Sequence, residues 1–150
     1  MENKINISED FFNDLRSLLR LDYAALEAYE VAIKKFSNKK YKEVFEQFKS
    51  DHNNHIKSIS DFFDKNNYDH PTDGGMKTLL TEGKVILVQL VGDRAILKAM
   101  KSNEKETTEA YKNINKHTQI SQDIKKVLEK GYKDEKKHLA WIEKELEEEK

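Results

Sequence analysis

Two short stretches, DYAALEAY at residues 22–29 and EKETTEAY at residues 104–111, decide how this chain folds. They lie 82 positions apart, and each begins with an acidic residue and ends with a tyrosine seven positions later. A second pair of stretches follows them, DHNNHI at residues 51–56 and DEKKHL at residues 134–139, separated by 83 positions. The chain therefore contains one design twice, and each copy is expected to be an antiparallel pair of helices.

Helical periodicity extends outward from these stretches in both directions. Core-like residues recur at alternating steps of three and four, as on one face of a helix. Ser8 is a good N-cap for the first helix, and Asp93, which follows the helix-breaking Gly92, is predicted to cap the fourth. We predict a single all-α domain over residues 1–150 with helices at about 8–37, 39–66, 76–91, 93–116 and 119–147.

The short third helix determines the expected topology. A loop at residues 68–75 contains Pro71, the only proline, and a Gly-Gly pair, and the helix predicted after it has 16 residues. Such a helix spans about 24 Å, which is enough to run the length of a helix bundle. The prediction is a ferritin-like four-helix bundle, with an additional crossover helix between its two antiparallel hairpins.

Composition limits the classes of function that this chain can have. Its 27 basic and 28 acidic residues nearly cancel, which argues against a nucleic-acid binder held by bulk charge. The absence of cysteine excludes disulfides and thiolate metal sites. The N-terminus lacks the layout of a signal peptide, and the longest apolar run, residues 85–90, is too short to cross a bilayer. We therefore expect a cytoplasmic protein with neither a membrane nor a nucleic acid as partner.

Polar side chains with metal-ligand chemistry interrupt the apolar face of every main helix. Burying a carboxylate or an imidazole without a partner is costly, and a metal ion would supply that partner. In di-iron carboxylate bundles, two helices supply one Glu each and the other two supply a Glu-x-x-His motif each. The candidate ligands in this chain are Asp22, His52, His55, Glu104, Glu135 and His138.

The heights of these residues along the helices support a common site. Asp22 and His52 each lie 15 residues from Ser37 in the first turn, so they face each other in an antiparallel hairpin. Glu27 and Glu109 also repeat between the two halves, but they lie about 7 Å away from that level. We retain both as additional candidate ligands.

A glutamate followed by tyrosine seven residues later, and then by Glu-x-x-His about thirty residues on, resembles rubrerythrin and its relatives in the ferritin-like superfamily. The chain departs from that pattern where Asp22 replaces a glutamate and where His52 stands in place of the glutamate of the first Glu-x-x-His. The full matches are Glu104, Tyr111, Glu135 and His138, and the partial matches are Asp22, Tyr29 and His55.

The stretch D-x-A-I-L-(x)6-E-(x)6-Y at residues 93–111, preceded by an extra helix and a break, is similar to the bacterial domain-of-unknown-function family 2383. Together the resemblances imply a ferritin-like fold and a centre with one or two ions of iron or manganese, or of zinc. Glu135 would bridge two ions, His55 and His138 would cap them, and Asp22 and Glu104 would be terminal ligands.

Our first hypothesis for the function is a metal-binding oxidoreductase that acts on O2, peroxide or Fe(II). Tyr29 and Tyr111 would lie just outside the ligands as hydrogen-bonded core residues. Because an imidazole at His52 is expected to bind through one nitrogen, we predict an asymmetric site, with tighter binding near Glu104, Glu135 and His138 than near Asp22, His52 and His55.

A second interpretation stays open at this point. It is a non-catalytic helical bundle that serves in stress or in interactions with other proteins and retains a degenerate metal site. The same polar residues can also form a buried network without metal. Assembly into a homodimer or a higher homo-oligomer is compatible with either interpretation.

Overall fold

The computed structural model describes residues 8–73 and 87–148, and this part of the chain is all-helical, without a β-strand. It contains four long helices: α1 (Glu9–Lys35), α2 (Lys39–Lys65), α4 (Asp93–Ile114) and α5 (Gln122–Glu148). The predicted all-α class is thereby confirmed. Of the predicted helix at 76–91, residues 76–86 lie outside the described residues, and Leu87 to Gln89 form one helical turn. α5 begins later than the predicted residue 119, because turns and bends occupy residues 115–121.

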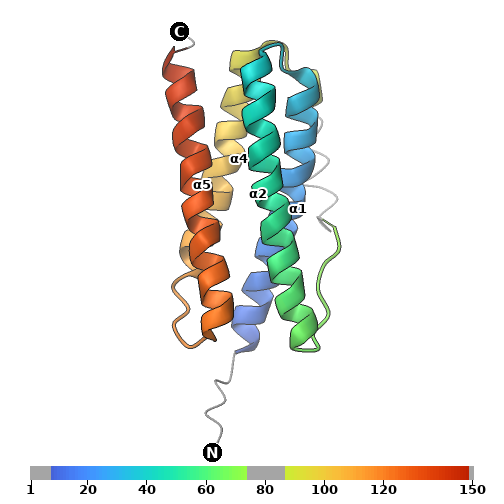
Figure 1. The fold of residues 1–150 in the computed structure, drawn as a ribbon, viewed down its shortest axis with the longest axis vertical. Coiled ribbons are helices and arrows are strands. Elements are labelled where there is room, and N and C mark those ends of the chain that lie inside the picture. Colours follow the sequence, from blue (N-terminus) through green and yellow to red (C-terminus); the bar gives the residue numbers. More distant parts are fainter. Residues whose placement is uncertain (1–7, 74–86, 149–150) are drawn as a thin grey trace, which may run out of the picture.

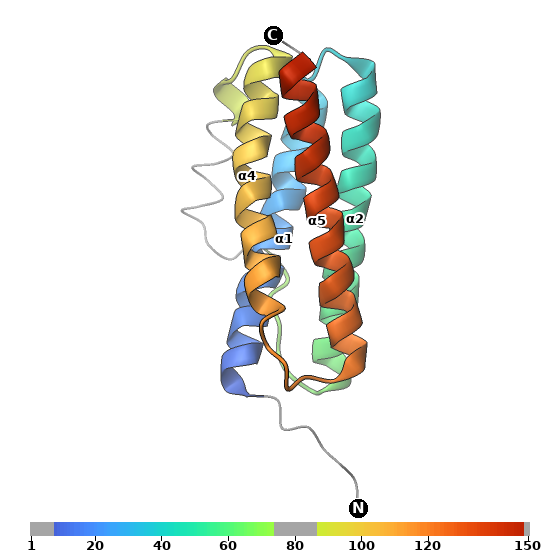
Figure 2. The same cartoon turned by 90° about the vertical axis from the view of Figure 1, so that its left-hand side faces the viewer.

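The four helices lie side by side, with α1 next to α2 and α4, and α5 next to α2 and α4 (Figures 1 and 2). Neighbouring helices run in opposite directions. α2 ends at the end of the assembly where α1 begins, whereas α4 begins at the opposite end (Figure 1). The chain therefore leaves α2 at one end of the assembly and enters α4 at the other (Figure 1).

Local hydrogen bonds explain where the helices begin. The Ser8 hydroxyl accepts a hydrogen bond from the Phe11 N–H, and the Asn38 side chain accepts hydrogen bonds from the N–H groups of Lys40 and Tyr41. Each bond satisfies a backbone donor that the first turn of a helix leaves free. Both residues are therefore N-caps, of α1 and of α2.

The prediction that Asp93 is an N-cap is wrong. The N-cap of α4 is Gly92, with φ +94°, and it makes no side-chain capping bond. The Asp93 carboxylate instead accepts hydrogen bonds from the backbone N–H groups of Ser37, at 2.8 Å, and Asn38, at 3.0 Å. Asp93 thus fastens the start of α4 to the turn between α1 and α2.

The core consists of two apolar clusters, one towards each end of the helices. Phe11, Leu15, Ile59, Phe63 and Leu128 belong to the cluster at the end where α1 begins. Phe36, Phe45, Leu97, Met100 and Ile142 belong to the cluster at the other end. Buried polar residues occupy the level between the clusters, since Asp22 follows Leu19 and Glu104 follows Met100.

None of the described helices is long and apolar enough to cross a membrane.

Candidate metal centre

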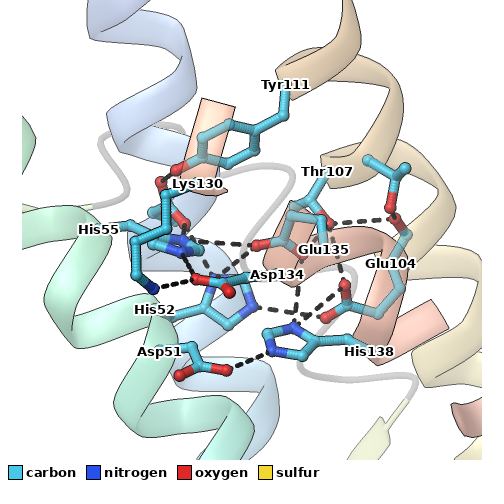
Figure 3. Close-up of polar contacts among 12 residues, drawn as sticks. Asp51, His52, His55, Glu104, Thr107, Tyr111, Lys130, Asp134, Glu135 and His138 are labelled. Atoms are coloured by element: carbon cyan, nitrogen blue, oxygen red, sulfur yellow. Dashed lines mark hydrogen bonds and ion pairs between the residues drawn. The ribbon is translucent and has the colours of Figure 1, made fainter. Parts of the chain in front are cut away.

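All six candidate ligands lie in this polar layer, at the middle of the helices. Each helix contributes at least one, α1 and α4 one apiece and α2 and α5 two apiece. None of their side chains is more than 4% exposed, which removes them from solvent almost completely. The six are Asp22, His52, His55, Glu104, Glu135 and His138, five of which are labelled in Figure 3.

In the described part of the chain, their ligand atoms form two overlapping groups that could hold a metal ion. Asp22, His52, His55 and Glu135 make the first group, and their ligand atoms lie within 4.8 Å of one another. The His52 Nδ1 lies 2.9 Å from Asp22 Oδ1, and the His55 Nδ1 lies 3.5 Å from the same oxygen. The first group therefore combines two carboxylates with two imidazoles.

The second group consists of His52, Glu104, Glu135 and His138, again within 4.8 Å of one another. The His138 Nδ1 lies 3.7 Å from Glu104 Oε2 and 3.7 Å from Glu135 Oε2, while the His52 Nε2 lies 3.4 Å from Glu104 Oε1. Both groups contain two carboxylates and two imidazoles, because His52 and Glu135 belong to both.

Three ligand atoms in this centre are buried and have no hydrogen-bond partner in the described structure. They are the Nδ1 atoms of His55 and His138 and the Oε1 of Glu135. Most buried polar atoms in folded proteins have a partner, because an unpaired one carries its full desolvation penalty. The centre therefore presents polar atoms to one another at distances of 3.5–3.7 Å, too long for hydrogen bonds and wide enough for an ion between them.

The outward nitrogens of two of these histidines are held by aspartates that sequence reasoning missed. The His55 Nε2 lies 2.9 Å from Asp134 Oδ2, and the His138 Nε2 lies 2.7 Å from Asp51 Oδ2. Lys130 donates a further hydrogen bond to Asp134, at 2.8 Å (Figure 3). A carboxylate on the outer nitrogen fixes the ring and leaves the inner nitrogen for a metal.

Two tyrosines connect the centre to the opposite hairpin. The Tyr111 hydroxyl of α4 donates to Asp22 Oδ2 of α1 at 2.6 Å, and the Tyr29 hydroxyl of α1 donates to Glu104 of α4. Both rings are fully buried. Each tyrosine therefore orients the carboxylate contributed by the other hairpin.

A threonine on α4 also contacts the centre, and the sequence alone did not identify it. Thr107 is buried, at 4% exposure, whereas Thr108 is only partly buried. Its hydroxyl donates to Glu135 Oε2 at 3.2 Å and contacts Glu104 Oε2 at 3.5 Å. Thr107 therefore braces the carboxylates of the second group.

The additional candidates Glu27 and Glu109 belong to neither group. Glu27 is partly buried and Glu109 is exposed. Their offset from the level of Asp22 along the helices keeps them out of the centre.

A comparison with protein-family models identifies one match, Domain of unknown function (DUF2383), over residues 10–117. The chain belongs to the DUF2383 family. The matched range covers α1 from its second residue, α2 and α4, but it ends before α5, which supplies Glu135 and His138. Searches of curated proteins and of solved structures return no match.

The carboxylates of this DUF2383 centre differ in their ionisation. Burial and the neighbouring Glu104 charge raise the pKa of Glu135 well above its ordinary value. Burial also opposes the ionisation of Glu104, but the side chains of Glu135, His138 and His52 beside it outweigh burial and bring the pKa of Glu104 well below its usual range. Of this pair, Glu135 is thus the carboxyl group that keeps its proton to the higher pH.

The three histidines all hold their protons more tightly than a free imidazole. Burial would lower the pKa of His52, but the Glu135 charge and the hydrogen bond to Asp22 raise it well above the ordinary value. Burial would also lower the pKa values of His55 and His138. The hydrogen bond to Asp134 raises the pKa of His55 nonetheless, and the hydrogen bond to Asp51 raises that of His138. Since a metal binds only deprotonated nitrogen and carboxylate, binding must release protons and strengthen as the pH rises.

Proposed function

We propose that this DUF2383 protein is a ferritin-like four-helix bundle that binds one or two metal ions in its polar layer. Iron and manganese are the proposed ions, with zinc as a third, and the proposed activity is oxidation–reduction on O2, peroxide or Fe(II). The proposal for the fold is supported by two antiparallel hairpins, α1 with α2 and α4 with α5, that pack side by side (Figure 1).

One observation carries the proposal for metal binding: three inward-facing ligand atoms of His55, His138 and Glu135 are buried without a partner. A polar network built only for stability would satisfy these atoms. The donor set also fits, because imidazole and carboxylate together suit iron and zinc, and carboxylate suits manganese.

The roles of the side chains follow from their orientation. His55 and His138 would bind through Nδ1, since Asp134 and Asp51 occupy their Nε2 atoms. Glu135 would lie between the two groups, with Asp22 and Glu104 as terminal ligands. A bound redox metal would supply electrons to O2 or peroxide, and the apolar clusters above and below the layer would keep bulk water out.

Elemental analysis of protein purified without chelators, together with melting curves, tests metal binding. Fe(II), Mn(II) or Zn(II) should raise the melting temperature, because an ion that binds only the folded chain stabilises it. The double variant Glu135→Ala/His138→Ala should lose this rise, whereas Glu109→Ala, an exposed acid outside both groups, should keep it. Protein that contains no metal and shows no thermal response to any of the three ions would refute the proposal.

A non-catalytic bundle remains the second candidate, and one observation favours it. Asp22, His52 and Glu104 already have hydrogen-bond partners within the protein, so part of the centre is satisfied without an ion. Rates of Fe(II) oxidation by O2 or peroxide separate the two candidates. An oxidase should accelerate the reaction and lose the acceleration in Glu104→Gln and Glu135→Gln, whereas stoichiometric metal binding without acceleration favours the non-catalytic protein.

A further inference from the structure

His52 is the one histidine of the centre whose two ring nitrogens both face inward. Its Nδ1 lies 2.9 Å from Asp22 Oδ1, and its Nε2 lies 3.4 Å from Glu104 Oε1. In contrast, His55 and His138 each direct one nitrogen outward to an aspartate. The His52 ring is fully buried and lies between Asp22 of α1 and Glu104 of α4, with one ring nitrogen facing each carboxylate.

Glu135 also contacts both groups, through its two carboxylate oxygens. Its Oε1 lies 3.4 Å from His52 Nδ1 and 3.6 Å from His55 Nδ1. Its Oε2 lies 3.7 Å from His138 Nδ1 and accepts the hydrogen bond from Thr107. The Oε1 of Glu135 thus faces two histidines, His52 and His55, and its Oε2 faces the third, His138.

The remaining ligands divide cleanly. Asp22 and His55 belong only to the first group, and Glu104 and His138 belong only to the second. The two residues that belong to both groups are therefore His52 and Glu135. Each of them directs one ligand atom to the first group and another to the second.

We propose that His52 bridges two metal ions, binding one through Nδ1 beside Asp22 and His55 and the other through Nε2 beside Glu104 and His138. Glu135 is the second bridge. This inference rests on the proposed metal-binding function. It replaces the one-sided assignment of His52 made from the sequence, because both of its nitrogens face ligands.

Bridging by one ring changes the chemistry of the pair of ions. A nitrogen that binds a metal carries no proton, so the ring releases its N–H protons to solvent as the two ions bind. Metal–nitrogen bonds of about 2.0–2.1 Å on both sides of the ring place the ions up to about 6 Å apart. In two-metal sites without a ring between the ions, the ions lie only about 3.5–4 Å apart.

Crystals of the full chain grown with Zn(II) test the geometry directly. Anomalous maps should contain two peaks about 5–6 Å apart, with the His52 Nδ1 bound to one ion and its Nε2 to the other. Two ions only about 3.5–4 Å apart, or a His52 that touches one ion, would overturn the inference and leave the proposed function intact. Absence of any bound ion would contradict the proposed function itself.

Calorimetric titration with Zn(II) tests the same point in solution, with matched controls. His52→Gln should weaken the binding of both ions by about tenfold or more, because a glutamine offers one ligand oxygen and cannot serve both groups. His55→Gln should weaken only the ion beside Asp22, and His138→Gln only the ion beside Glu104. Circular dichroism confirms that each variant is folded. If His52→Gln weakens one ion and spares the other, His52 is not a bridge.

Discussion

Replacing Gly131 with alanine should destabilise this protein, although the same change stabilises most helices. Glycine in a helix interior is about 1 kcal/mol less favourable than alanine. Here the added Cβ would lie 2.3 Å from the Tyr111 Cε1 and 2.8 Å from its Cδ1, distances at which the ring must move. Because Tyr111 is only 1% exposed, the ring has no open space to enter.

The size of the effect follows from what Tyr111 does. Overpacking a core costs about 1–3 kcal/mol, and loss of a hydrogen bond to a charged group costs about 1.5–3 kcal/mol. The bond at risk is the one from the Tyr111 hydroxyl to Asp22. After the gain in helix propensity, we expect Gly131→Ala to lower the free energy of unfolding by about 2–4 kcal/mol and to lower Tm by roughly 8 °C.

Urea denaturation measures this free energy, and two variants serve as controls. Lys126→Ala, on the exposed face of the same helix, should change it by no more than about 0.5 kcal/mol. In a Tyr111→Ala background the obstructing ring is gone, so adding Gly131→Ala should stabilise the protein by up to about 1 kcal/mol. A stabilising effect of Gly131→Ala in the wild type would refute the close packing of Tyr111 on α5.

Three further outcomes follow from the hydrogen bonds of two aspartates, Asp134 beside the centre and Asp93 at the turn between α1 and α2. Asp134→Asn should weaken metal binding about 10–100-fold in calorimetry while the protein stays folded, because Asp134 orients His55. Partial burial would raise the pKa of Asp134, but hydrogen bonds from His55 and Lys130 outweigh burial and lower this pKa to about 2. The ionised Asp134 therefore stabilises the folded protein above its unfolded pKa, near 3.8, and this stabilisation is lost as the pH falls towards 2. The melting temperature of Asp134→Asn should accordingly fall less than that of the wild type over this range. Asp93→Ala should lower the free energy of unfolding by about 1–2 kcal/mol in urea, since it leaves two backbone N–H groups without their carboxylate.

The sequence predicted the level of the centre because spacing along a helix converts directly into height. Asp22 and His52, equally far from the turn at Ser37, are in contact at 2.9 Å. Rotation about a helix axis is harder to predict than height. Thr107 and Thr108 differ by one position, and only packing against α5 decides that Thr107 faces Glu135.

Residues that act across long sequence distances could not be assigned from local patterns. Asp51 and Asp134 precede the two histidine motifs in the repeat, which was the one available signal, but an aspartate on a helix is usually solvated. Their roles depend on partners 87 and 79 residues away, His138 and His55. Asp93 was misassigned for the same reason, since its partners lie in a turn more than 50 residues earlier.

The internal repeat explains why neither half of the chain can build the centre alone. Asp51 of α2 supports a histidine of α5, and Asp134 of α5 supports a histidine of α2. In the same crossed manner, Tyr29 of α1 donates a hydrogen bond to Glu104 of α4, and Tyr111 of α4 donates one to Asp22 of α1. Every ligand outside the shared pair is therefore oriented by a residue of the opposite hairpin. Metal binding and the docking of the two hairpins must then be coupled, so that an ion which stabilises the centre also stabilises the contact between α1 and α4 and between α2 and α5.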